Sequence, residues 1–280
     1  MAAKAVPALQ AITDTPLQID TSNYEAMEKA LRLYNGKPML NSVNGKEDSL
    51  QHVLPLGAIR VAAGLSHWVA ENARSARALL KRVDAVVPLA QPLQALSIRE
   101  LPRPPKGRAD PKAPAPDWAG LLAPALTGHD VGLVSEAGLP AVADPGAELV
   151  RVAHAQGITV MPLSGPSSLI LAVAASGLNG QSFAFVGYLP TDAAERTRRL
   201  RDLEAHSRRW QQTQLLIETP YRNAAMAQAL LAALSPQTWL SISCGLTLEG
   251  GATRTLRVAQ WRVSPPELPG DVPAVFAFLA

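Results

Sequence analysis

Two short loops rich in small residues stand where predicted strands end and helices begin. Residues 135–146 read SEAGLPAVADPG, and residues 164–168 read SGPSS. Small residues let a bound molecule approach backbone N–H and C=O groups closely. Because open parallel sheets bind ligands at the carboxyl ends of their strands, the two loops indicate a small-molecule site. The alternative is ordinary turn chemistry between strands and helices.

Several common catalytic signatures are missing from the sequence. It contains no G-x-S-x-G turn, no H-E-x-x-H motif, no P-loop and no G-x-G-x-x-G after a predicted strand. The five histidines are scattered, and the one cysteine, Cys244, lies in an apolar stretch. These observations argue against a serine hydrolase, a nucleoside triphosphatase, a dinucleotide dehydrogenase and a disulfide framework. We expect no metal centre.

The elements that must position the two loops alternate between strand and helix patterns, which is typical of an α/β fold. A helix over 72–82 is predicted to turn Arg74, Arg77 and Lys81 outward. Asp144 and Ser167 are the expected N-caps of two later helices. Those two helices are expected over 144–156 and 167–176. Further helices are expected over 56–63, 192–207 and 221–234. The expected strands include 67–70, 132–135, 158–161, 183–187 and 214–218.

Breaks in this pattern suggest three parts. Residues 1–48 look like one β-α-β unit, with strands at 16–20 and 38–43. A linker at 188–190 separates an N-terminal domain, residues 49–187, from a C-terminal domain, residues 188–280. The basic, proline-rich residues 102–116 predict a long loop, since prolines at that density prevent regular structure.

Composition and charge limit the class of protein. The chain has 280 residues, 48% hydrophobic and 18% charged, so it can bury a core and is not a disordered regulator. A net charge of +3 permits an RNA or phosphate partner. No apolar run reaches the roughly 18–20 residues of a membrane span, and no secretory signal is evident. We therefore expect no membrane contact and a cytoplasmic location.

Five segments form an ordered set of motifs. They read ENARSARALL (71–80), SEAGLPAVADPG (135–146), PLSGPSS (162–168), GYLP (187–190) and IETPYR (217–222). In order and spacing they resemble motifs of the tetrapyrrole methylase superfamily, above all those of its ribosomal RNA small-subunit methyltransferase I branch. The resemblance runs from about residue 50 to the C-terminus. One departure is Glu136, which stands where the family motif has aspartate.

The resemblance implies a two-domain α/β protein with a mostly parallel N-terminal sheet and a smaller, mixed-sheet C-terminal domain. It also implies a homodimer that binds S-adenosylmethionine (SAM) between the domains and methylates a ribose 2′-hydroxyl of small-subunit ribosomal RNA. Glu71, Arg74 and Arg77 would face the substrate end of this cleft. The residues implied to bind SAM are Ser135, Glu136, Ala137, Gly138, Gly165, Pro166, Ser167, Ser168, Tyr221 and Arg222.

The implied roles are chemically coherent. Glu71 could act as a general base for a 2′-hydroxyl. Arg74 and Arg77 lie three residues apart on one helix face and could bind a phosphate, or they could form a solvated surface. The arginine-rich helix around 195–201 and the basic segment 102–116 are further candidate RNA contacts, with an ordinary exposed helix and loop as the alternative.

The N-terminal residues depart from the family pattern. Residues 15–48 instead resemble a β-α-β piece of the pterin-binding barrel of cobalamin-dependent methionine synthases, in which the equivalents of Asp20 and Asn41 touch the pterin. One such unit cannot close an eight-stranded barrel. Our hypothesis is a chimeric chain in which Met39–Val43 supplies a strand to the N-terminal sheet. The alternatives to an RNA methyltransferase are then a folded chimera of weak or no activity and a tetrapyrrole-biosynthesis methylase.

Overall fold

A three-stranded parallel sheet follows directly from the buried pattern around residue 68. The computed structural model describes residues 18–20, 39–41, 54–102 and 116–280. Strand β3 (His67–Ala70) lies in the centre and pairs in parallel with β4 (Ser97–Glu100) on one edge and β5 (Val131–Val134) on the other. Trp68 and Val69 are buried, as expected for a parallel strand covered on both faces.

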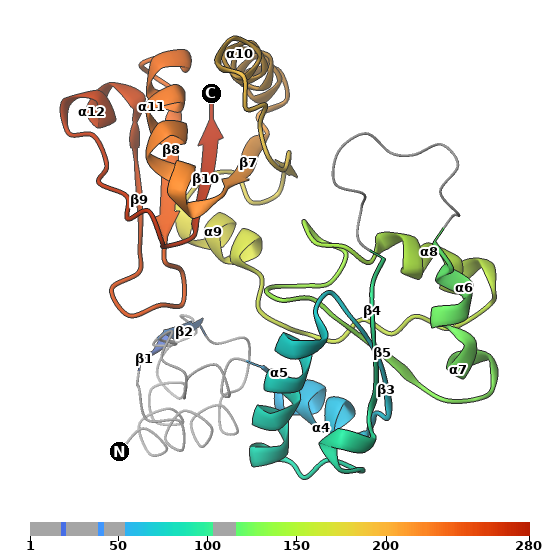
Figure 1. Cartoon of the computed structure of the whole chain (residues 1–280). Helices are drawn as coiled ribbons and strands as arrows, with labels where there is room; N and C mark the ends of the chain where they lie inside the picture. The colour runs from blue at the N-terminus through green and yellow to red at the C-terminus, as the bar shows by residue number, and fades with distance from the viewer. Residues whose placement is uncertain (1–17, 21–38, 42–53, 103–115) are drawn as a thin grey trace, which may run out of the picture. The chain divides into compact units, whose positions relative to one another are not determined.

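Helices cover both faces of this sheet (Figure 1). Trp68 packs with Leu80 on one face, whereas Val69 packs with Leu121 and Leu149 on the other, because successive strand residues point to opposite faces. The first face carries α4 and α5, and the second carries α6 and α8. The helices are α4 (Leu56–Gly64), α5 (Ala73–Val86), η1 (Leu93–Ala95), α6 (Trp118–Leu121), α7 (Ala123–Leu126) and α8 (Ala147–Ala155).

A second sheet has five strands in the order β6-β7-β10-β8-β9. Its β6 and β7 are parallel and its other pairs are antiparallel, so the predicted mixed sheet is confirmed. The strands are β6 (Phe183–Phe185), β7 (Thr213–Glu218), β8 (Trp239–Cys244), β9 (Ala252–Arg257) and β10 (Ala274–Leu279).

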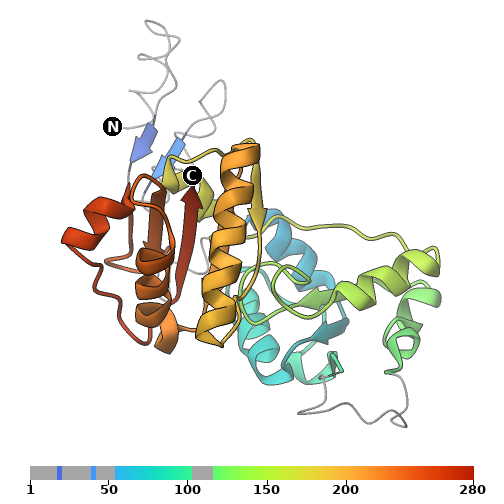
Figure 2. The same cartoon turned by 90° about the horizontal axis from the view of Figure 1, so that it is seen from above.

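The two faces of the second sheet carry different helices. Phe276 and Phe278 of β10 pack in one apolar cluster with α10 (Ala193–Trp210), α11 (Asn223–Ala233) and α12 (Val258–Val263). Figure 2 shows the long helix α10 beside the strands. The alternate residues Val275 and Ala277 pack against α9 (Ser168–Ser176). In the described ranges no helix has the length and apolar character that crossing a membrane requires.

Two elements that precede residue 188, β6 and α9, pack with this second sheet. β6 pairs with β7, and α9 contacts β8, β9 and β10. The Thr255 hydroxyl also donates a hydrogen bond of 2.8 Å to the Ser176 carbonyl. The strand that we assigned to the N-terminal domain therefore completes the C-terminal sheet, because its pairing partner is β7. The division at residue 188 itself stays a prediction.

The N-terminal segment is described only at two short strands. β1 (Gln18–Asp20) and β2 (Met39–Asn41) pair in parallel, as a β-α-β unit requires. The predicted helix between them lies outside the described residues, as do residues 103–115. The described strands β1 and β2 form a two-stranded sheet, and the prediction that Met39–Val43 supplies a strand to the N-terminal sheet stays a prediction.

Two local predictions also fail. Residues 158–161 form no strand, since in the described ranges β5 is an edge strand whose only partner is β3. Asp144 is not the N-cap of α8: that position is Gly146. The backbone at Ala143 (φ 64°) and Gly146 (φ 132°) is left-handed, so the helix cannot begin before residue 147.

Candidate functional site

Carboxylates meet where the parallel strands end. Glu71 follows β3, and Ser135 and Glu136 follow β5, so the adjacent strands bring them together. The Glu71 amide donates to the Val134 carbonyl at 3.2 Å, and the Glu136 amide donates to the Glu71 carboxylate at 3.2 Å. The loop after β5 is thereby fastened to the end of β3.

The first turn of α5 adds to this cluster. The Asn72 side chain caps the helix by accepting from the Arg74 amide at 2.9 Å. The Ser75 hydroxyl donates to the Glu136 carboxylate at 2.9 Å. A carboxylate near a helix N-terminus interacts favourably with the helix dipole. Glu136, one methylene longer than the aspartate of the family motif, thus links the loop after β5 to α5.

Burial perturbs a third acid in the same loop. The pKa of Asp144 is raised above its usual value of 3.8, first by burial and then by the nearby charges of Glu71 and Glu136. A hydrogen bond from Ser135 opposes this effect and lowers the pKa. Glu71, Glu136 and Asp144 therefore form a single acidic cluster, which favours a cationic ligand.

The loop that carries Asp144 has an unusual backbone. Ala141 and Ala143 adopt positive φ angles of 66° and 64°, and Gly138 has φ of 72°. Such angles are costly for alanine and concentrate at ligand-binding loops. A side chain at Gly138 would meet no atom within 4 Å, so the backbone there faces open space.

The second small-residue loop touches the first. A Cβ atom added at Gly165 would lie 3.4 Å from a methyl group of Leu139. Ser167 stands at the N-cap of α9 but makes no side-chain capping bond, and Ser168 begins the helix. The predicted residues 135–138 and 165–168 thus belong to two neighbouring loops, as the sequence indicated.

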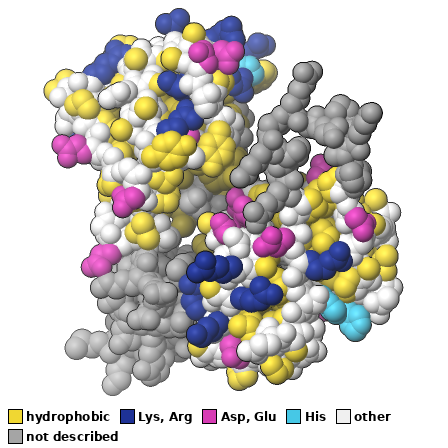
Figure 3. Space-filling view, viewed as in Figure 1, with side chains coloured by type: hydrophobic (Ala, Val, Ile, Leu, Met, Phe, Trp, Pro, Cys, Tyr) yellow, Lys and Arg dark blue, Asp and Glu magenta, His cyan; other side chains and the backbone are white. Residues whose placement is uncertain are grey.

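Arg74 and Arg77 lie on the exposed face of α5, as predicted. Figure 3 shows dark blue side chains gathered over this helix. Neither arginine forms an ion pair with a described residue, and Arg77 donates only a long 3.4 Å hydrogen bond to the Ala73 carbonyl. The two guanidinium groups are therefore available to an anion beside the acidic cluster.

Tyr221 and Arg222 lie elsewhere, at the end of β7 in η2 (Pro220–Arg222). Arg222 pairs with Glu218 at 3.1 Å, and Tyr221 is 76% exposed. In the described ranges no hydrogen bond or ion pair joins either residue to the two loops. Their predicted contact with the cofactor stays a prediction.

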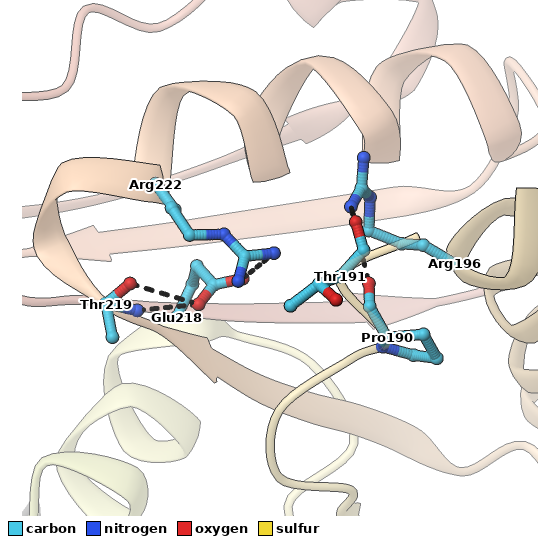
Figure 4. Close-up of polar contacts among 6 residues, drawn as sticks. All are labelled: Pro190, Thr191, Arg196, Glu218, Thr219 and Arg222. Carbon is cyan, nitrogen blue, oxygen red and sulfur yellow. Dashed lines mark hydrogen bonds and ion pairs between the residues drawn. The ribbon is translucent and has the colours of Figure 1, made fainter. Parts of the chain in front are cut away.

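A cavity beside Arg222 brings together side chains that the sequence analysis did not combine into one site. Its volume is about 380 Å³, and Figure 4 draws its polar contacts. The signals were the charged start of α10, which supplies Arg196, and the i, i+4 spacing of Glu218 and Arg222, which predicts an ion pair. The lining residues are Thr191, Arg196, Glu218, Arg222, Ala225 and Met226.

Comparison with known proteins identifies relatives of this chain. Ribosomal RNA small subunit methyltransferase I of Mesorhizobium japonicum is 38% identical over 153 residues, 54% of this chain and 48% of that protein. Its counterpart in Pseudomonas aeruginosa is 44% identical over 95 residues, 34% of this chain and 32% of that protein. The chain thus spans less than half the length of these two relatives.

A solved structure and a family model also match this chain. The crystal structure of the methyltransferase CobJ has a TM-score of 0.50 and 18% identity, and the match covers 84% of this chain and 90% of that one. The family model described as Tetrapyrrole (Corrin/Porphyrin) Methylases matches residues 73–257. The match begins after residues 15–48, so the chimera hypothesis for that segment stays a hypothesis. The chain belongs to the tetrapyrrole (corrin/porphyrin) methylase family.

Proposed function

We propose that this protein is a SAM-dependent methyltransferase that modifies a ribose 2′-hydroxyl of small-subunit ribosomal RNA. The observation that carries the proposal is the acidic cluster of Glu71, Glu136 and Asp144 at the carboxyl ends of β3 and β5, in a chain of this family. The partial similarity to small-subunit methyltransferases supports the choice of RNA substrate.

The residues of the cluster fit SAM by their chemistry. The sulfonium and the ammonium group of SAM are cationic, and the cluster offers three carboxylates. The loop residues 135–138 and 165–168 present small side chains, and the space beside Gly138 is open to a ligand. A bound cation would also relieve the repulsion from Glu71 and Glu136, which adds to burial in raising the pKa of Asp144.

The protein's own residues then position the nucleophile. When bound, SAM would supply a sulfonium methyl group and leave as a neutral thioether, so an in-line approach of the hydroxyl is the main requirement. Glu71 is fixed by the Glu136 amide and is the candidate base that takes the hydroxyl proton. Arg74 and Arg77 would bind the phosphates beside the target ribose.

The proposal extends to assembly and location. Resemblance to the family supports a homodimer, and a ribosomal RNA substrate supports a cytoplasmic protein. Light scattering after size-exclusion chromatography tests the first point: a mass of one chain at micromolar concentration would contradict a dimer.

Calorimetry and a transfer assay test the activity itself. We expect micromolar SAM binding, about −8 kcal/mol, and transfer of radioactive methyl groups to small ribosomal subunits. Glu136→Ala should weaken SAM binding, whereas Glu148→Ala, which removes an exposed carboxylate on α8, should not. A stable protein that binds no SAM would contradict the proposal and favour a folded, inactive chimera.

A further inference from the structure

We propose that the cavity at the carboxyl end of β7 binds a phosphodiester group of single-stranded RNA. The inference rests on the proposed function, since it assigns the cavity to the RNA substrate. The residue assigned to the phosphate is Arg196, which lines the cavity together with Arg222.

One carboxylate organises the floor of the cavity. The Glu218 side chain is only 2% exposed. One of its oxygens accepts from the Thr219 amide at 2.9 Å and from the Thr219 hydroxyl at 3.3 Å, and the other contacts Arg222 at 3.1 Å. Figure 4 shows Arg222 held over this carboxylate. The charge of Glu218 is therefore already balanced, and the pair as a whole is neutral.

Arg196 supplies the charge that is not balanced. Its Nη1 donates to the Pro190 carbonyl at 3.3 Å and to the Thr191 carbonyl at 2.9 Å, which fixes the guanidinium at the start of α10. Its Nε is buried and has no hydrogen-bond partner, and no described carboxylate lies within ion-pair distance. Arg196 is half-buried, and its charge has no described carboxylate to pair with, so the cavity favours a ligand that carries one negative charge and can accept from the buried Nε.

A phosphodiester meets these requirements. It has one negative charge and two oxygens that match the fork of a guanidinium. The volume of about 380 Å³ exceeds that of a phosphate group, and Ala225 and Met226 give the cavity an apolar side suited to a sugar. The cavity thus has room for a phosphate that carries part of a nucleoside.

The surroundings favour RNA that is unpaired. Tyr188 and Tyr221 are 57% and 76% exposed, and in the sequence they come within three residues of the lining residues Thr191 and Arg222. Exposed aromatic rings beside arginines stack on the bases of single-stranded nucleic acids. The exposed Arg198 and Arg199 of α10 extend the positive charge from the cavity along the helix.

A binding assay with matched variants tests the inference. The probe is a fluorescent single-stranded RNA of about 12 nucleotides, titrated with the full chain across a range of salt concentrations. We expect Arg196→Gln to weaken binding about tenfold and to reduce the salt slope by about 1, as the loss of one phosphate contact predicts. Arg201→Gln, which removes the same charge from the exposed side of α10, should weaken binding about threefold or less.

Further measurements distinguish a phosphate contact from a loss of folding or of cofactor binding. Arg196→Lys keeps the charge but loses the guanidinium fork, and should bind RNA with intermediate affinity while the melting temperature stays near that of the wild type. SAM binding should be unchanged in Arg196→Gln. Inorganic phosphate should displace the RNA only at concentrations far above the Kd for RNA.

Each contrary result has a distinct meaning. Equal effects of Arg196→Gln and Arg201→Gln would overturn the inference, because the contact would then be nonspecific. A parallel loss of SAM binding in Arg196→Gln would overturn it in favour of a cofactor site, and displacement by dilute phosphate would overturn it in favour of a free-phosphate site. Failure of the wild type to bind SAM contradicts the proposed function alone, since the RNA titration contains no SAM.

Discussion

The acidic cluster after β3 and β5 and the cavity after β7 occupy equivalent positions in two different sheets. Both lie at the carboxyl end of a strand, and both combine glutamate with nearby arginine. In the cluster three carboxylates lie close together, and burial, reinforced by the charges of Glu71 and Glu136, raises the pKa of Asp144. In the cavity the single carboxylate forms an ion pair with Arg222, whereas the guanidinium of Arg196 has no described carboxylate partner.

This difference assigns opposite ligands to the two regions. Excess carboxylate favours a cation such as the sulfonium of SAM, and excess guanidinium favours an anion such as RNA phosphate. It also predicts that Glu218, the acid of the cavity, stabilises the fold, whereas Glu71 in the cluster takes part in the reaction. Replacing the acids one at a time tests that contrast.

The largest effect on stability is expected from Glu218→Ala. The change leaves Arg222 without its partner and removes the acceptor for Thr219, so unfolding should become easier by about 3 kcal/mol. Urea denaturation measures this loss. Glu148→Ala, in an exposed pair with Arg151, is the control and should cost less than about 0.5 kcal/mol. Equal costs for the two variants would show that Glu218 does not organise the cavity.

Glu71→Gln should have the opposite profile. The amide keeps the size of the side chain and can still accept from the Glu136 amide, so stability should change little. As the loss of a general base, it should lower kcat/KM for methyl transfer about 100-fold. Initial rates on small ribosomal subunits, together with a melting curve, separate the two effects. A variant with full activity would contradict the role of Glu71.

Backbone geometry gives a smaller effect in the loop beside the cluster. Gly138→Ala places a side chain at φ of 72°, where no atom is within 4 Å, so the cost comes from the backbone alone. We expect about 1 kcal/mol in urea denaturation. Gly270→Ala meets no neighbour either and has no positive φ, so it should be close to neutral. Similar costs would mean that the loop relaxes when the side chain is added.

The sequence predicts the elements better than their pairing. Hydrophobic periodicity located β3, α5 and α10 because each buries a regular face of its own. It could not assign β6 to a sheet, since pairing depends on a strand more than twenty residues away. It also could not foresee that residues 158–161 would lack a partner, because a strand forms only where a neighbour accepts its hydrogen bonds.

The candidate site likewise has a part that the sequence predicts, the two loops, and a part that it does not, the cavity. Small residues in 135–146 and 164–168 marked the two loops, because glycine and proline have local reasons to stand in turns. The cavity was not predicted because Arg196 and Glu218 are 22 residues apart in the sequence, at the far ends of two consecutive elements, and only the antiparallel return of β7 along α10 brings them together. The net charge at a site depends on which side chains the fold brings together, and residue spacing in the sequence does not predict it.

The smallest expected effect sharpens the contrast in charge. In unfolded chains Asp144 should titrate near its usual pKa of 3.8, whereas in the folded protein burial and the charges of Glu71 and Glu136 raise the pKa. As the pH rises through 3.8 the unfolded state releases this proton first, so stability falls until the pH passes the folded pKa, and a constant penalty remains above it. Asp144→Asn removes that penalty.

The variant should therefore match the wild type below the usual pKa and exceed it at neutral pH. Solvent screens this half-buried group, so the gain should be no more than about 0.5 kcal/mol. Urea denaturation at a series of pH values measures the difference. A bound cation would offset the repulsion from Glu71 and Glu136, so saturating SAM should reduce the advantage of Asp144→Asn. If Asp144→Asn is instead less stable than the wild type at neutral pH, the charged form of Asp144 is favoured by the fold, and the cluster has no excess of carboxylate.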